Sequence, residues 1–134
     1  MDLIAVADEL GAALKTIDGL TVPEWGEQRV SPPFALIPLP EIAYDMAYGR
    51  TGWRIEDWPL MVLVDRPVKP ESRRAVVEYA ARSGPLSVKA AIEGHTYTTC
   101  DTVRVASCDF DEATYNNVPY LAATFHLDIS GKGA

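Results

Sequence analysis

Five consecutive apolar residues near the middle of the chain, Leu60 to Val64, most constrain how this protein can fold. They end a segment from Trp53 to Val64 that favours an extended conformation. An apolar run without alternation is typical of a strand that is buried on both faces. The run is also far shorter than a membrane-spanning helix requires. It therefore predicts a central strand in one domain, and the length of 134 residues fits a single domain.

Three further segments carry helical signals. Residues 3–17 repeat apolar side chains at spacings of three and four, with Asp2 as a candidate N-cap and Gly19 as a stop. A second helix is expected to begin at Pro70 and to end before Gly84, with its packing face formed by Val76, Val77, Tyr79 and Ala80. A third is expected over Val88 to Glu93, capped by Ser87 and stopped by Gly94.

The other strands are predicted from alternation. Thr102 to Phe110 and Tyr120 to Ile129 alternate, and in the second of these the odd-numbered residues share one face while His126 lies on the opposite one. The linker between them, 111–117, is expected to be an exposed loop. Residues 20–25 and Phe34 to Leu39 are expected to be short strands, the latter at a sheet edge or a bulge because of Pro38. The domain is expected to span residues 1–130, and residues 131–134 to form a flexible tail.

A β-hairpin is predicted before the central strand. Two glycines, Gly49 and Gly52, bracket a turn between the segment Glu41 to Tyr48 and the strand that begins at Trp53. Its aromatic and arginine side chains are of the kinds enriched in protein interfaces, so they are candidates for subunit contacts. The candidates are Tyr44, Tyr48, Arg50, Trp53, Arg54 and Trp58 in the hairpin and Tyr115 in the later linker. The alternatives are a hairpin folded back on its own domain and an ordinary exposed loop.

Charge and cysteine usage limit the function classes. The net charge is −7 and the basic residues are scattered, which disfavours a protein that grips nucleic-acid phosphates. The acidic excess either serves solubility or lines a surface along which DNA passes without sticking. Cys100 and Cys108, eight residues apart in one expected strand, would lie about 27 Å apart, so both are predicted to be free thiols.

The sequence predicts no catalytic, metal-binding or cofactor-binding residue. It has no Gly-x-Ser-x-Gly elbow, and a Cys108–His126 pair is conceivable only if the last two strands pair. His95 follows a glycine in a loop. The acidic residues Asp109, Asp111 and Glu112 are expected to be solvated rather than to hold a metal ion.

A set of short sequence segments (phrases), taken in their order along the chain, resembles the tail terminator, or tail completion, proteins of long-tailed siphophages, particularly those of actinobacterial phages and prophages. The resemblance covers nearly the whole chain. In chain order, the phrases are Pro32 to Ile37, Pro40 to Asp45, Gly49-Arg50, Trp58 to Val64, Ser83 to Glu93, Asp101 to Val105 and Tyr120 to Phe125.

This resemblance implies an α+β fold with a mixed, mostly antiparallel sheet packed by two or three helices. It also implies a structural virion protein without enzyme activity, which forms a ring, with six subunits as the expected number. The ring would cap the head-proximal end of the tail tube and stop its polymerisation. Its partners would be copies of itself, the major tail tube protein and a head-completion or stopper protein. DNA would pass through the lumen without specific binding, and no membrane would be involved.

The protein would then belong to the tail or neck of the virion and would be assembled in the host cytoplasm. Two alternatives stay open at this point. One is another head-to-tail connector station, such as a stopper or neck subunit. The other is a small ligand-binding domain or enzyme that uses His95, His126 or Cys108.

Overall fold

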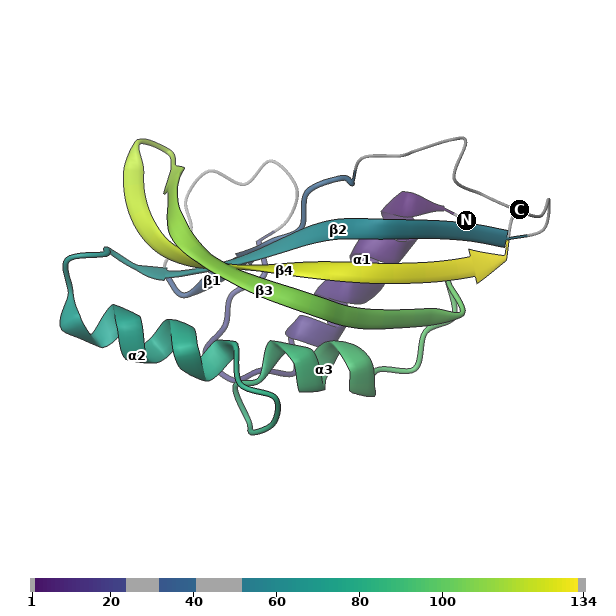
Figure 1. Cartoon of the computed structure of the whole chain (residues 1–134), viewed down its shortest axis with the longest axis horizontal. Coiled ribbons are helices and arrows are strands. Elements are labelled where there is room, and N and C mark those ends of the chain that lie inside the picture. The colour runs from purple at the N-terminus through teal and green to yellow at the C-terminus, as the bar shows by residue number, and fades with distance from the viewer. Residues whose placement is uncertain (1, 24–31, 41–51, 133–134) are drawn as a thin grey trace.

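A computed structural model of the chain describes residues 2–23, 32–40 and 52–132. Its elements are α1 (Leu3–Leu14), β1 (Phe34–Leu36), β2 (Gly52–Asp65), α2 (Pro70–Tyr79), α3 (Val88–Gly94), β3 (Thr102–Tyr115) and β4 (Val118–Lys132). The strands form one antiparallel sheet in the order β1-β2-β4-β3, with the helices packed against it (Figure 1). The α+β prediction is confirmed. Within the described part of the chain, no helix combines the length and apolar character needed to cross a membrane.

The apolar run lies in β2, which is a central strand as predicted. β1 pairs with one side of β2 and β4 with the other. Leu60 and Val62 pack on the helix side of the sheet, whereas Leu63 packs on the opposite side. Burial on both faces explains why the run shows no alternation. β1 is an edge strand, which is one of the two positions predicted from Pro38.

The helix caps also follow from the sequence. The Asp2 carboxylate accepts the backbone N–H of Ile4 at 3.0 Å, and α1 ends at Leu14 rather than at residue 17. The Ser87 hydroxyl accepts the N–H of Ala90 at 3.1 Å at the start of α3. The expected packing face of α2 is wrong at one position, because the side chain of Val77 is 59% exposed.

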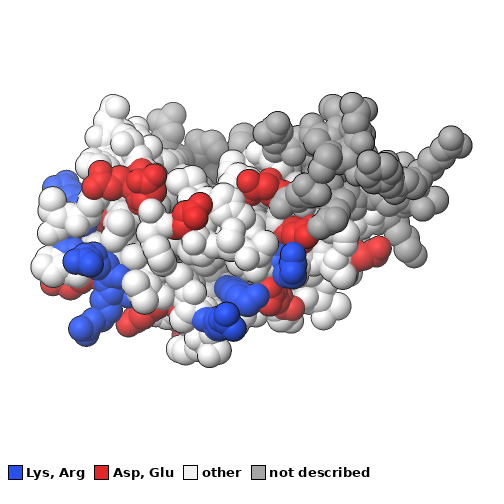
Figure 2. Space-filling view, viewed as in Figure 1, with Lys and Arg blue, Asp and Glu red and all other residues white. Residues whose placement is uncertain are grey.

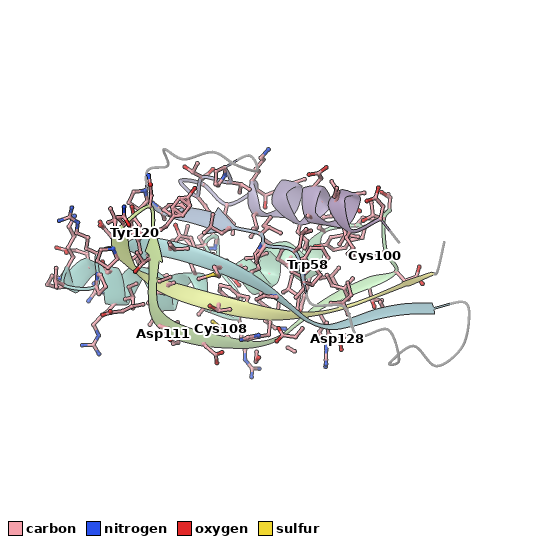
Figure 3. The ribbon with its side chains drawn as sticks, turned by 90° about the horizontal axis from the view of Figure 1, so that it is seen from above. Trp58, Cys100, Cys108, Asp111, Tyr120 and Asp128 are labelled. Carbon is pink, nitrogen blue, oxygen red and sulfur yellow. The ribbon has the colours of Figure 1, made fainter. Side chains whose placement is uncertain are left out.

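The main hydrophobic core lies between the three helices and one face of the sheet. Trp58 is fully buried there, and its indole N–H donates to the carbonyl oxygen of Pro38 at 2.7 Å. Figure 3 shows Trp58 and Cys100 on the side of the sheet that α1 covers. Cys100 and Cys108 are both free thiols, as predicted, although Cys100 precedes β3.

The expected exposed loop over residues 111–117 is wrong. β3 continues through Tyr115, and only Asn116 and Asn117 form the turn, with positive φ angles of 53° and 65°. Asparagine tolerates this left-handed conformation better than most residues, so two adjacent asparagines suit a two-residue hairpin turn. The predicted tail also begins too early, because β4 extends to Lys132 and pairs there with Gly52 of β2.

A second, smaller core holds the β3–β4 hairpin on the other face of the sheet. Phe34 of β1, Leu63 of β2 and Ala122 of β4 are buried together. Tyr115 and Tyr120, near the tip of the hairpin, meet Phe34 edge-to-face at centroid distances of 5.3 and 5.4 Å. These aromatic contacts join the tip of the hairpin to the opposite edge strand of the sheet.

Candidate interaction surface

The structure tests only part of the predicted interface. Tyr44, Tyr48 and Arg50 lie outside the described residues, and so does the turn of the predicted hairpin. Trp53 and Arg54 belong to β2, where their backbone pairs with residues of β4. Their place in an extended strand is the part of this prediction that is confirmed. Their role in subunit contacts stays a prediction.

Two of the predicted interface side chains pack inside their own domain. Trp58 is a core residue with no exposed surface, because it packs in the main hydrophobic core and its indole N–H donates to the carbonyl oxygen of Pro38. It therefore has no free face to offer a partner. Tyr115 is a residue of β3 rather than of an exposed loop, and its half-buried ring packs against Phe34 of β1. Aromatic residues supply core burial as readily as they supply interfaces, and the subunit contact of Tyr115 stays a prediction.

The Cys108–His126 pair does not form. β3 and β4 do pair, but the register places Cys108 opposite Phe125 and His126 opposite Ser107. Successive strand residues point to opposite faces, so the thiol and the imidazole lie on different sides of the sheet. Burial, and then the charge of Asp109, raises the pKa of the Cys108 thiol to about 11. Protonated thiols are poor nucleophiles.

Each histidine is held by carboxylates instead. The two ring nitrogens of His126 lie 2.7 Å from Asp57 of β2 and 2.7 Å from Asp109 of β3. These hydrogen bonds raise the pKa of His126, and with both nitrogens engaged the ring bridges three strands. His95 lies 3.3 Å from Glu9, which also accepts the backbone N–H groups of Thr98 and Thr99. Both arrangements tie segments of the fold together.

The outer edge of β3 is covered at Val105, in the first half of the strand. The carboxylate of Glu93 in α3 accepts the N–H of Val105 at 2.9 Å, and the ammonium of Lys89 lies 3.4 Å from the carbonyl oxygen of Val105. Lys89 and Glu93 form an ion pair of 2.6 Å, one helical turn apart. Side chains of α3 thus occupy the two backbone groups of Val105 that an added strand would need.

The second half of this edge is free of such cover in the described structure. Thr114 is opposite Pro119, which has no N–H, so the backbone groups of Thr114 point away from β4. The register continues without a shift to Ser107, and alternation gives Glu112, Phe110 and Cys108 the same outward direction. Among these four, only the N–H of Glu112 has an intramolecular partner in the described structure, the carboxylate of Asp111 at 2.7 Å.

The side chains along this distal edge are exposed. Phe110 is 51% exposed, and Asp111 and Glu112 are also on the surface. Figure 2 shows acidic residues over the hairpin and basic residues below them, over α2. We call residues 108–114 of β3 the distal edge. Residues 111–117 were predicted as a loop and a candidate contact rather than as a strand edge, and the Asn116-Asn117 pair was the signal that identifies the hairpin.

No protein-family model matches this chain. No curated protein matches it either. Among the described residues, no group of three His, Cys, Asp or Glu side chains could hold a metal ion. The candidate site that the structure offers is an interaction surface, defined by the distal edge of β3 and the side chains around it.

Proposed function

We propose that this protein is a structural phage-tail subunit that assembles into a ring and works as a tail terminator. The ring caps the head-proximal end of the tail tube, stops its polymerisation and joins it to head-completion proteins. The mature location is the tail or neck of the virion. Support for this station comes from the ordered phrases that resemble siphophage tail terminators, from Pro32 to Phe125.

Besides the resemblance, the main structural support for the proposal is the distal edge of β3. Within the described residues, the outward backbone groups of Cys108, Phe110 and Thr114 have no partner, and a half-exposed phenylalanine lies among them, in a hairpin that is fixed to the domain. An open strand edge is a common route to association, because it offers a row of hydrogen-bonding groups. A ring needs a surface of this kind on each subunit, together with a different surface that receives it.

The charge of the chain suits the proposed lumen. With 19 acidic and 12 basic residues, the subunit carries a net charge of −7. A ring of six would carry several tens of negative charges in total. DNA that passes through such a ring is repelled rather than retained, because affinity for DNA comes largely from neutralising its phosphates.

Imaging of phage that lacks this protein tests the assigned station. A terminator predicts overlong tails without heads, because nothing stops the tube from growing. Tails of normal length that fail to join heads would instead identify a stopper or neck subunit, the second connector station.

A second test uses purified protein and tail tubes. We expect the protein to bind one end of each tube and to block further addition of tube subunits. Bovine serum albumin at the same concentration serves as the protein control. A chain that remains monomeric at all concentrations and never binds tube ends would contradict the proposal.

A further inference from the structure

Charged residues are separated along this chain. Residues 105–131 contain four acidic residues and no lysine or arginine. Residues 66–82 contain five of the twelve basic residues, with only Glu71 and Glu78 as acids. The first segment forms the β3–β4 hairpin and the second contains α2, so one end of the molecule carries an acidic hairpin and a basic helix (Figures 1 and 2).

The two charged surfaces do not neutralise each other within the described structure. Arg73 and Arg74 of α2 are exposed, and neither forms an ion pair with a described residue. Glu112 of β3 is likewise exposed and makes no ion pair there. Asp109 differs, because it is already bonded to His126.

Each surface also has an exposed apolar side chain beside its charges. Val77 of α2 is 59% exposed and lies one helical turn from Arg73, about 6 Å along the axis. Phe110 of β3 is 51% exposed and lies two residues from Glu112 on the same face of the strand, about 7 Å away. The apolar-to-charged spacing is therefore nearly equal on the two surfaces, and the charges are opposite.

We propose that the distal edge of β3 in one copy of this chain docks on the exposed face of α2 in the next copy. Phe110 packs against Val77, and Glu112 faces Arg73 and Arg74. The inference rests on the proposed self-assembly and names the contact that produces it. Because the two surfaces are different, the contact is heterologous and can be repeated around a ring.

The same charges disfavour the simplest competing arrangement. Two copies that paired their β3 edges would bring Asp111 and Glu112 of each close to the acidic residues of the other. Like charges directly opposite each other destabilise strand pairing, and acidic residues on an edge are a common means of preventing it. A basic helix is the partner that converts this repulsion into attraction.

Charge reversal with restoration by mixing tests the contact. The variants are Glu112→Arg on the hairpin and Arg73→Glu on the helix. Their matched controls, Asp8→Arg and Lys15→Glu, make the same charge changes at exposed sites on or next to α1. Sedimentation velocity measures self-association, both of free protein and on tail tubes, and thermal unfolding confirms that each variant folds.

Each reversal should weaken assembly by about tenfold or more, whereas the controls should assemble like the wild type. An equimolar mixture of the two variants should assemble again. Each contact between unlike variants pairs either the two original charges or the two reversed charges, which have opposite signs, whereas a contact within one variant pairs like charges. Failure of the mixture to assemble, or equal losses in the controls, would overturn the contact.

The outcomes separate this inference from the proposed function. If the wild type caps tube ends but both reversals cap them equally well, the terminator role stands and the contact is wrong. If the mixture restores assembly but no assembled form binds tubes, the contact stands and the terminator role is wrong. If the wild type assembles neither alone nor on tubes, both are wrong.

Discussion

Replacement of Glu9 by glutamine should destabilise the fold in a way that depends on pH. Glu9 lies in α1, but its carboxylate accepts hydrogen bonds from the loop that precedes β3. The donors are the N–H groups of Thr98 and Thr99, at 3.0 and 2.9 Å, and the hydroxyl of Thr99 at 2.5 Å. The side chain is only 16% exposed. Glutamine keeps the shape but loses the charge and one acceptor oxygen.

The shift in the pKa of Glu9 gives the expected loss in the free energy of unfolding. Burial alone would raise this pKa, but the hydrogen bonds from Thr99, Thr98 and His95 outweigh it and lower the value from 4.5 to about 2. A fall of that size corresponds to about 3 kcal/mol at about 1.36 kcal/mol for each pH unit. Solvent screening at this partly exposed site reduces the figure, so we expect a loss of about 2 kcal/mol at pH 7.

The sign of the pH dependence follows from a lowered pKa. The charged Glu9 stabilises the fold fully above pH 4.5, and its contribution is lost as the pH falls from 4.5 toward 2. Urea denaturation of the wild type and Glu9→Gln should therefore give free energies of unfolding that converge in this range.

Asp8→Asn is the matched control, because Asp8 is the exposed neighbouring carboxylate. It should change the free energy of unfolding by less than about 0.5 kcal/mol. A Glu9→Gln loss as small as that of the control at pH 7, or a loss that stays constant down to pH 2, would refute the reasoning.

Three further variants test other parts of the fold. Trp58→Ala should cost about 3–5 kcal/mol in urea denaturation, because it empties a fully buried site, and a loss below 1 kcal/mol would place Trp58 outside the core. His126→Gln should destabilise the protein most at low pH. The hydrogen bonds of Asp57 and Asp109 raise the pKa of His126, so its contribution is full below about pH 6.5 and is lost as the pH rises through the folded-state value. The melting temperatures of wild type and variant should converge at alkaline pH. A difference in melting temperature that increased at alkaline pH would contradict the stabilising role of the hydrogen bonds of His126. Asn117→Gly should raise the free energy of unfolding by up to about 1 kcal/mol at its φ of 65°, and a decrease would argue against the two-residue turn.

Local signals predicted much of the fold. The unbroken apolar run of Leu60 to Val64 identified the central strand, and alternation in β4 assigned its two faces, with His126 on the side away from the main core. Asp2 and Ser87 marked the starts of two helices because a side-chain cap acts within a few residues. Structural features that depend only on residues close together in the chain can be predicted directly from the sequence.

The candidate surface depends on contacts that the sequence does not display. Asp111 and Glu112 are typical loop residues, and only pairing with β4 makes them part of a strand. Trp58 is equally suited to a core and to an interface, and its burial depends on α1 and on Pro38. Glu9 meets Thr98 across about ninety residues, a distance over which no periodic pattern gives a signal.

The packing of Phe34 against Tyr115 and Tyr120 has a mechanical consequence. The hairpin tip is fastened to the far edge of the sheet, so it cannot swing as an independent arm. A pull on the turn would load β1 at the same time as β3 and β4, and the strain would spread across the full width of the sheet. The turn can therefore be displaced only together with the body of the domain.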